Sequence, residues 1–200
     1  MGHVKADRNE SMAAKAISSQ LGHSATVLLL IDFINPLDFD GAQEMADAAL
    51  QAARAAATLK ARVLAEGGQC IYANDNYGTW RSNFPELWRK CRAMKGAPGR
   101  IASALKPGPT DLTVLKPRHS AFYCTPLDLM LGQLKPRRLI LCGLATDNCV
   151  LFSAMDAYLR GYRLWIPADC AAAESEGVHR QALQHMARVL KASIRPMTCS

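Results

Sequence analysis

The sequence has 200 residues, of which 50% are hydrophobic, and its formal net charge at pH 7 is +7. A chain of this length and apolar content can bury the core of one α/β domain, and no linker divides it into two. Its longest apolar run, residues 27–31, is far shorter than the ~18 residues of a membrane-spanning helix, so we expect no membrane partner.

The N-terminal segment and the cysteines bear on the compartment in which the protein works. Residues 1–24 carry charged side chains and no apolar core of a signal peptide, so we expect a tail or short surface helix ahead of one domain over residues 25–200. The seven cysteines are an odd number without CxxC spacing, and we expect them to be reduced thiols of a cytoplasmic protein.

Short apolar segments alternate with helix-length segments along the chain. The patterns predict strands at residues 26–31, 70–73, 112–115, 138–142, 163–166 and 193–197. They predict helices at residues 43–66, 85–94, 126–134, 149–160 and 177–190, with Thr125 capping the third and a long irregular segment, 74–111, around the second. Strands separated by helices form parallel sheets. The predicted fold class is therefore α/β, a three-layer αβα architecture with a mainly parallel, doubly wound, Rossmann-like sheet.

A cysteine stands where the fourth predicted strand gives way to a helix. Residues 139–150 run from an apolar strand through a polar turn into the helix, which we expect to begin at Cys149. Helix-start amides and nearby cations favour a thiolate over a thiol. A helix terminus supplies about 0.3 to 1 kcal/mol, whereas lowering the thiol pKa by about two units needs roughly 2.7 kcal/mol. We therefore expect a second positive group near Cys149.

Two further polar residues follow predicted strands. Asp32 ends the first strand and Lys116 ends the third. Ligands of open parallel sheets bind outside the carboxyl ends of the strands, so we expect Asp32, Lys116 and Cys149 to converge at one edge. Lys116 would supply the missing cation, and Asp32 would take the thiol proton and return it to a leaving amine. Each residue alone has a plainer explanation, as a turn cap, a solvated loop lysine or a buried small hydrophobe.

Three fragments of the sequence resemble the isochorismatase-like cysteine hydrolases, a superfamily that includes nicotinamidases and N-carbamoylsarcosine amidase. The fragments are Asp32, the stretch KPRHSAF over residues 116–122 and the stretch GLATDNCV over residues 143–150. The resemblance covers roughly residues 26 to 198. It implies a catalytic triad of Asp32, Lys116 and Cys149.

The resemblance also implies how the backbone takes part. The Leu144–Ala145 peptide bond would be cis, and the N–H groups of Ala145 and Cys149 would form an oxyanion hole. The implied reaction is hydrolysis of a small amide or related carbonyl compound through an acyl-enzyme on Cys149. Two alternatives stay open: an isochorismatase-type vinyl-ether hydrolase, which would not need Cys149, and a non-catalytic binding protein on the same scaffold.

A metal site is not expected. The metal-dependent nicotinamidases carry an Asp-x-His pair after the second strand, where this sequence has Asn74, Asp75 and Asn76. No histidine lies between His23 and His119. Since asparagine is a weak ligand and one aspartate holds an ion loosely, we expect neither a metal nor a cofactor.

Four aromatic residues are candidates for the walls of a substrate pocket: Phe33, Tyr77, Trp80 and Phe122. As large apolar side chains, they could equally belong to the core or to subunit contacts. Trp80 and its neighbour Arg81 are the better candidates for contact with a substrate or an interface. We expect a small-molecule substrate and a homo-oligomeric protein, either a dimer or a tetramer.

The positive net charge comes largely from two basic clusters, within residues 89–106 and 135–138. Such clusters are usually solvated surfaces, and no nucleic-acid-binding motif accompanies them. We therefore expect no nucleic-acid partner. A mild preference for anionic substrates or partners is compatible with the charge.

Overall fold

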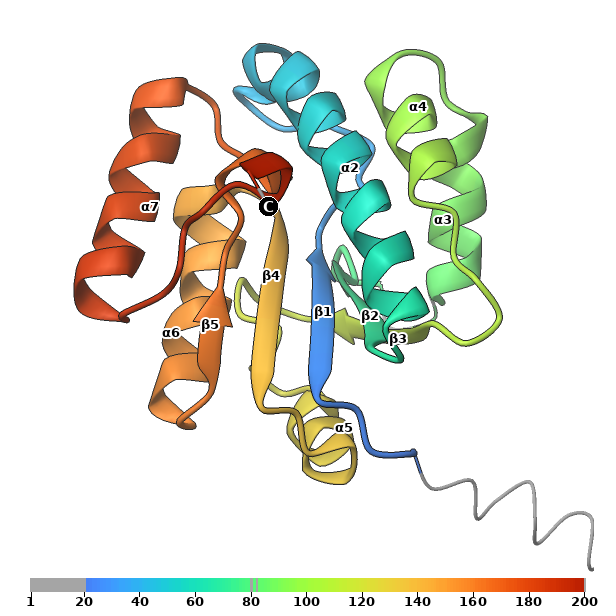
Figure 1. Ribbon diagram of the computed structural model, residues 1–200. Coiled ribbons are helices and arrows are strands. Elements are labelled where there is room, and N and C mark those ends of the chain that lie inside the picture. The colour runs from blue at the N-terminus through green and yellow to red at the C-terminus, as the bar shows by residue number, and fades with distance from the viewer. Residues whose placement is uncertain (1–20, 80, 82, 200) are drawn as a thin grey trace, which may run out of the picture.

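The computed structural model describes residues 21–79, 81 and 83–199, so the expected N-terminal tail falls almost entirely outside the described residues. A parallel sheet forms the centre of the domain (Figure 1). Its strands are β1 (Thr26–Ile31), β2 (Gln69–Asp75), β3 (Leu112–Lys116), β4 (Arg138–Leu144), β5 (Arg163–Trp165) and β6 (Ala171–Ala172). The spatial order is β3-β2-β1-β4-β5, and β6 pairs with β4. The predicted α/β fold with a parallel sheet is confirmed.

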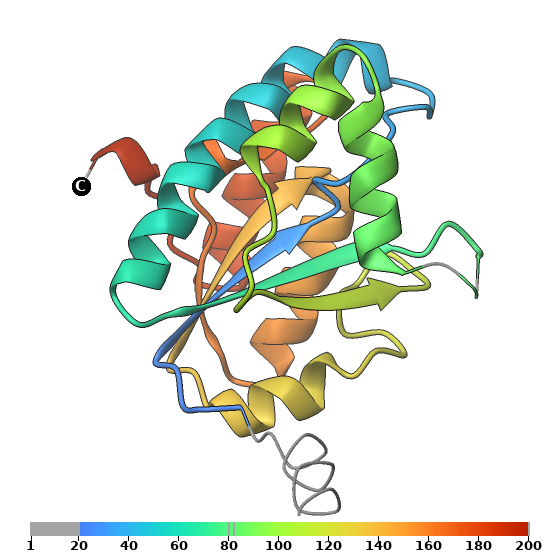
Figure 2. The ribbon, with the colours of Figure 1, turned by 90° about the vertical axis from the view of Figure 1, so that its right-hand side faces the viewer.

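Helices cover both faces of the sheet (Figure 2). One face carries α2 (Ala42–Ala65), α3 (Phe84–Ala93) and α4 (Ala97–Ala104), and the other carries α5 (Leu127–Leu134), α6 (Leu151–Leu159) and α7 (Glu176–Val189). Side chains of β1 alternate between the two cores, with Leu28 and Leu30 in the first and Leu29 and Ile31 in the second. Because helices cover both faces of the sheet, both sets of β1 side chains are buried, and the strand is apolar without interruption from Val27 to Ile31. Among the described residues, no helix is both long and apolar enough to cross a membrane.

The sheet is wound in two directions from β1. The chain passes through β2 and β3 on one side and through β4 and β5 on the other. In open α/β sheets, ligands bind near the carboxyl ends of the two strands where such a reversal occurs, here β1 and β4. The two strands approach closely at this point, because a Cβ on Gly143 would lie 2.1 Å from the carbonyl oxygen of Ile31. A glycine is therefore required beside the end of β1.

The segment 74–111 is more regular than the sequence predicts. It contains the expected helix, α3, and also α4, which the sequence analysis missed. Gly96, Pro98 and Gly99 indicate a helix break, but the proline stands in the first turn of α4, where no hydrogen bond is lost. A Cβ on Gly99 would lie 2.0 Å from the Met94 carbonyl oxygen. The glycine thus permits the tight corner between the two helices.

The predicted last strand, residues 193–197, is wrong. One isolated bridge joins Ser193 to Trp165 of β5, and Met197–Cys199 form a short 3₁₀ turn. The carboxylate of Asp169 accepts two backbone N–H groups of this turn, at 2.8 and 3.1 Å, which removes those donors from strand pairing. The two-residue strand β6 was also not predicted, since so short an element leaves no periodic pattern.

Candidate active site

Asp32 lies directly after β1, and its φ of 50° ends the extended backbone. Aspartate enters this left-handed region more readily than most residues. Its side chain is buried, with the whole residue 5% exposed. The Oδ1 atom accepts the backbone N–H of Asp75 at 2.7 Å, and the Oδ2 atom lies 2.6 Å from Nζ of Lys116. Both carboxylate oxygens therefore have a partner.

Lys116 ends β3 and is 0% exposed. An ammonium group has three protons to donate. Three acceptors are in reach of Nζ: Asp32 Oδ2 at 2.6 Å, the Arg118 carbonyl oxygen at 3.2 Å and Cys149 Sγ at 3.5 Å. The buried cation is thus both paired and fully hydrogen-bonded, which is the condition under which a protein interior tolerates a charge.

Cys149 does not begin an α-helix, contrary to the sequence prediction. It lies in a π-helical turn, Thr146–Val150, that leads into α6. The N–H of Val150 donates to the Ala145 carbonyl oxygen at 3.2 Å and closes this wide turn. Helical structure starts at Thr146, and β4 extends two residues beyond its predicted end, to Leu144, so only Ala145 separates the strand from the helical turn. The peptide bond between Leu144 and Ala145, just before the turn, is cis.

The thiol of Cys149 has a raised pKa, whereas the sequence analysis predicts a lowered one. Burial raises the pKa, the Asp32 carboxylate raises it further, and Lys116 lowers it only in part, so that its value is about 12. The expected second cation is present, but it is already paired with Asp32. At neutral pH the group therefore rests with a protonated thiol beside an Asp–Lys ion pair.

The pKa values of Asp32 and Lys116 are also raised. For Asp32 the main cause is burial, which the charge of Lys116 opposes. For Lys116, burial lowers the pKa, but the negative charge of Asp32 outweighs it. A raised pKa makes Asp32 a better proton acceptor. Transfer of the thiol proton from Cys149 to Asp32 leaves the net charge of the three residues unchanged, so it costs less in a buried site than releasing that proton to solvent.

Two serines fix the segment after β3 against α6. The Ser153 hydroxyl donates to the Cys149 carbonyl oxygen at 2.7 Å and accepts the N–H of Ala121 at 2.9 Å. The Ser120 hydroxyl donates to Oδ2 of Asp156 at 2.5 Å. These hydrogen bonds hold the end of β3 and the π-helical turn in a constant relative position.

His179 of α7 supports the π-helical turn from a third element, and the sequence analysis missed it. Its Nδ1 lies 2.7 Å from Oγ1 of Thr146, and its Nε2 lies 3.0 Å from the Ala168 carbonyl oxygen. Because a carbonyl oxygen only accepts, Nε2 carries the proton and Nδ1 accepts the Thr146 hydroxyl. Burial lowers the pKa of His179, which favours this neutral form. No spacing in the sequence connects the two residues.

His119 is a second residue that the sequence analysis did not assign to the site. Its Nδ1 lies 3.8 Å from the Cys149 sulfur, and its ring centroid lies 5.4 Å from that of Phe152. Its place in the KPRHSAF stretch, three residues after Lys116, is the signal that could have drawn attention to it.

The four aromatic candidates are placed differently. Phe33 and Phe122 are 1% and 4% exposed and belong to the two hydrophobic cores, so core packing, which the sequence left open, accounts for both. Tyr77 lies in the loop after β2 and is 43% exposed. Trp80 lies outside the described residues.

Within residues 21–79, 81 and 83–199, no three His, Cys, Asp or Glu side chains are arranged to hold a metal ion. The loop after β2 uses its side-chain oxygens locally instead. The Asp75 carboxylate accepts the N–H of Tyr77 at 2.6 Å, and the Asn76 amide oxygen accepts the N–H of Gly78 at 2.9 Å. These residues therefore do not fit the metal pair of the metal-dependent nicotinamidases.

Comparison with known proteins assigns the family. The Isochorismatase domain model matches residues 26–196. The chain is 35% identical over 167 residues to the isochorismatase family protein YaaI of Bacillus subtilis, which covers 84% of this chain and 91% of YaaI. The chain therefore belongs to the isochorismatase family, whose members are hydrolases.

Two further matches cover a smaller part of the chain or have a lower sequence identity. Over 85 residues the chain is 39% identical to the ureidoacrylate amidohydrolase RutB of Methylorubrum extorquens, which covers 42% of this chain and 34% of RutB. The crystal structure of the nicotinamidase SaPncA from Staphylococcus aureus superposes with a TM-score of 0.65 at 20% identity, covering 88% of this chain and 99% of that protein. This structural match shows a shared fold.

Proposed function

We propose that the protein hydrolyses a C–N bond of a small amide or ureido compound through an acyl-enzyme formed on Cys149. The observation that carries the proposal is the position of the Lys116 ammonium, which contacts the Asp32 carboxylate at 2.6 Å and the Cys149 sulfur at 3.5 Å. A nucleophile, a base and a cation in mutual contact are the groups that acyl transfer requires.

In the first half-reaction, Asp32 removes the thiol proton of Cys149 while the sulfur attacks the carbonyl carbon of the substrate. Lys116 stays charged and stabilises the negative charge that forms on sulfur. The carbonyl oxygen becomes an oxyanion and accepts hydrogen bonds from the N–H groups of Ala145 and Cys149, each typically worth about 2.7 to 4 kcal/mol. Asp32 then protonates the leaving nitrogen, and the C–N bond breaks.

In the second half-reaction, Asp32 takes a proton from a water molecule that attacks the thioester carbonyl. The oxyanion forms in the same place, and its collapse breaks the C–S bond. The Cys149 sulfur takes the proton back from Asp32 as the acid product leaves. The three residues return to their resting protonation, and no step draws on a cofactor.

The substrate class is supported by the relatives. One of them is a ureidoacrylate amidohydrolase and one structural neighbour is a nicotinamidase, and both names denote cleavage of a C–N bond next to a carbonyl group. Cys149 favours this chemistry over hydrolysis of a vinyl ether, which needs no thiol nucleophile. The protonated resting thiol, with a pKa of about 12, suits a mechanism in which the base acts only when a carbonyl is in place.

A screen for ammonia release tests the proposal. Primary amides, ureides and N-carbamoyl amino acids would be offered to the wild-type protein and to Cys149→Ala, with isochorismate as a vinyl-ether substrate. We expect ammonia from at least one amide or ureide with the wild type and none with the variant. Turnover of isochorismate alone, retained in Cys149→Ala, would contradict the proposal and establish the vinyl-ether alternative.

A further inference from the structure

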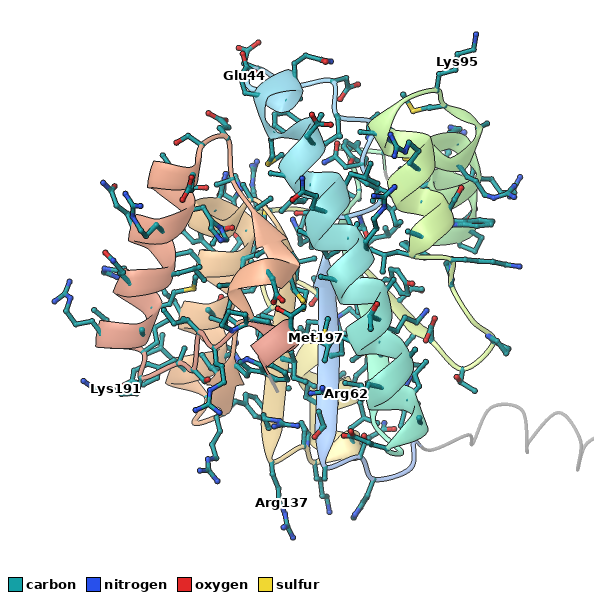
Figure 3. The ribbon with its side chains drawn as sticks, turned by 45° about the horizontal axis from the view of Figure 1, so that its top comes forward. Glu44, Arg62, Lys95, Arg137, Lys191 and Met197 are labelled. Atoms are coloured by element: carbon teal, nitrogen blue, oxygen red, sulfur yellow. The ribbon has the colours of Figure 1, made fainter. Side chains whose placement is uncertain are left out.

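A large cavity lies at the amino ends of β4 and β5, the edge of the sheet opposite Asp32, Lys116 and Cys149. Its volume is about 790 Å³, and none of its lining residues is acidic. Six of them are basic: Arg62, Arg137, Arg138, Arg163, Lys191 and Arg195. In Figure 3 the labelled members of this set lie in the lower half of the molecule, away from Glu44 and Lys95 at the top. We call this cavity the basic groove.

The centre of the basic groove is a pair of arginines that begin neighbouring strands. Arg138 and Arg163 are register partners on β4 and β5, so their side chains leave the sheet on the same side. Like charges in such positions repel each other. Among the described residues, the contacts of Arg138 are with uncharged groups, the Trp165 ring at 5.6 Å and the Thr26 hydroxyl at 3.4 Å.

Within the described part of the chain, most of the basic side chains of the groove have no carboxylate partner. Arg62 forms an ion pair with Glu66 at 3.8 Å. Among the residues that the structure describes, no carboxylate lies within ion-pair distance of the other five. An arrangement of this kind raises the local concentration of anions and favours their binding.

We propose that the basic groove binds a compact polyanion that carries a chain of phosphate groups, either free or as part of a nucleoside triphosphate. The cavity volume lies within the range of small-molecule sites. Guanidinium groups bind phosphate oxygens in a two-pronged geometry, and five of the six basic residues are arginines. Tyr158, Tyr162 and Trp165 also line the groove and offer ring surfaces to a base.

A small ligand fits the distribution of charge better than a nucleic acid does. The other basic cluster of the chain lies on α3 and α4, at the far side of the sheet from β5 (Figure 1). An extended strand of nucleic acid requires a long track of basic residues, whereas the six basic residues of the groove line one cavity. This arrangement suits a compact ligand that sits in the groove.

Calorimetric titration at low salt tests the proposal, with tripolyphosphate, ATP and a single-stranded RNA as three separate ligands. The groove variant is Arg138→Gln with Arg163→Gln, and Lys191→Gln with Arg195→Gln is a second one should the first fold poorly. The matched control is Arg89→Gln with Arg100→Gln, two exposed arginines of the other cluster that change the net charge equally. Thermal unfolding checks that each variant is folded.

We expect tripolyphosphate to bind the wild type, the groove variant to bind it about tenfold more weakly or worse, and the control to bind like the wild type. If ATP and tripolyphosphate bind with equal affinity, the groove recognises the phosphate chain alone. If ATP binds more tightly, the groove also contacts the nucleoside. Absence of binding, an equal loss in the control, or tighter binding of the RNA would overturn the proposal. Because the measurement needs no turnover, its failure leaves the proposed amide hydrolysis untouched.

Discussion

The charged side chains at the two edges of the sheet differ in burial and in pairing. At the carboxyl edge, Asp32 and Lys116 are 5% and 0% exposed and 2.6 Å apart, and each polar atom of the pair has a partner. At the amino edge, Arg138 and Arg163 stand in register with no carboxylate within ion-pair distance among the described residues. The same chain thus buries a neutralised pair at one edge and exposes a row of like charges at the other.

This difference suits the two proposed roles, proton transfer at the carboxyl edge and anion binding at the amino edge. A buried pair of opposite charges leaves a neighbouring thiol protonated, and it lets a proton move between Cys149 and Asp32 without a change in net charge. Exposed arginines cannot tune a pKa in this way, because water screens them, but they attract anions over a distance of several ångströms.

The largest expected effect is on turnover at the carboxyl edge. Replacement of the proposed nucleophile in Cys149→Ala should lower kcat for an amide substrate by about 10⁴-fold or more, because no other group in the site can form the acyl-enzyme. Cys124→Ala removes an exposed cysteine and should leave kcat unchanged. Steady-state kinetics on the two variants would contradict the account if their activities were alike.

The second prediction concerns stability and compares one cation from each edge. Lys116→Met leaves the Asp32 carboxylate buried without its partner and should lower the free energy of unfolding by about 3 to 5 kcal/mol. Arg163→Met removes an exposed charge and should change it by no more than about 0.5 kcal/mol. Urea denaturation of both variants makes the comparison. Equal losses in the free energy of unfolding would show that the buried Lys116 contributes no more to stability than the exposed Arg163.

The third prediction tests the close approach of β1 and β4. In Gly143→Ala the new methyl group would meet the Ile31 carbonyl oxygen at 2.1 Å, so we expect a loss of about 1 to 3 kcal/mol in the free energy of unfolding. Gly132→Ala, in α5, places its methyl group where no atom lies within 4 Å and should raise stability by about 0.5 to 1 kcal/mol. A neutral Gly143→Ala would contradict the packing described at the end of β1.

The smallest expected effect is a shift in titration at the carboxyl edge. Burial and Asp32 raise the pKa of the Cys149 thiol to about 12, so the wild type should show no inflection of thiolate absorbance from Cys149 near neutral pH. Asp32→Asn removes one of the raising causes and frees Lys116 to pair with sulfur, so the pKa should fall by at least about one unit. Turnover should fall as well, since the base is lost.

Ultraviolet titration of each protein, with the matching Cys149→Ala spectrum subtracted, measures this shift. An inflection near neutral pH in the wild type, unchanged in Asp32→Asn, would show that the carboxylate does not set the protonation of the thiol. Such a result would instead support the lowered pKa of the Cys149 thiol that the sequence predicts.

The sequence predicts the parts of the molecule that have local patterns. The apolar run of β1 and the alanine-rich α2 have strong periodic signals, and their predicted bounds agree with the structure to within one residue. Asp32, Lys116 and Cys149 are predicted to converge because each lies at or shortly after the end of a strand and parallel topology brings strand ends together. The structure places Lys116 in contact with both of the others.

Other features depend on contacts between distant segments and leave no local signal. His179 reaches Thr146 from a helix that starts 30 residues later in the chain, and only the packing of α7 brings the two together. The direction of the Cys149 pKa shift was predicted wrongly because it depends on burial and on Asp32 as well as on the lysine. A net shift of this kind follows from three-dimensional distances, which residue types alone do not supply.

Rapid-quench mass spectrometry during turnover of the best amide or ureide from the ammonia-release screen tests the central claim most directly. Peptide mapping of the quenched protein locates any acyl group bound to the chain. The account predicts a thioester on Cys149 in the wild type and no acyl group in Cys149→Ala. Turnover that proceeds with Cys149 unmodified, or with an acyl group on a different residue, would contradict it.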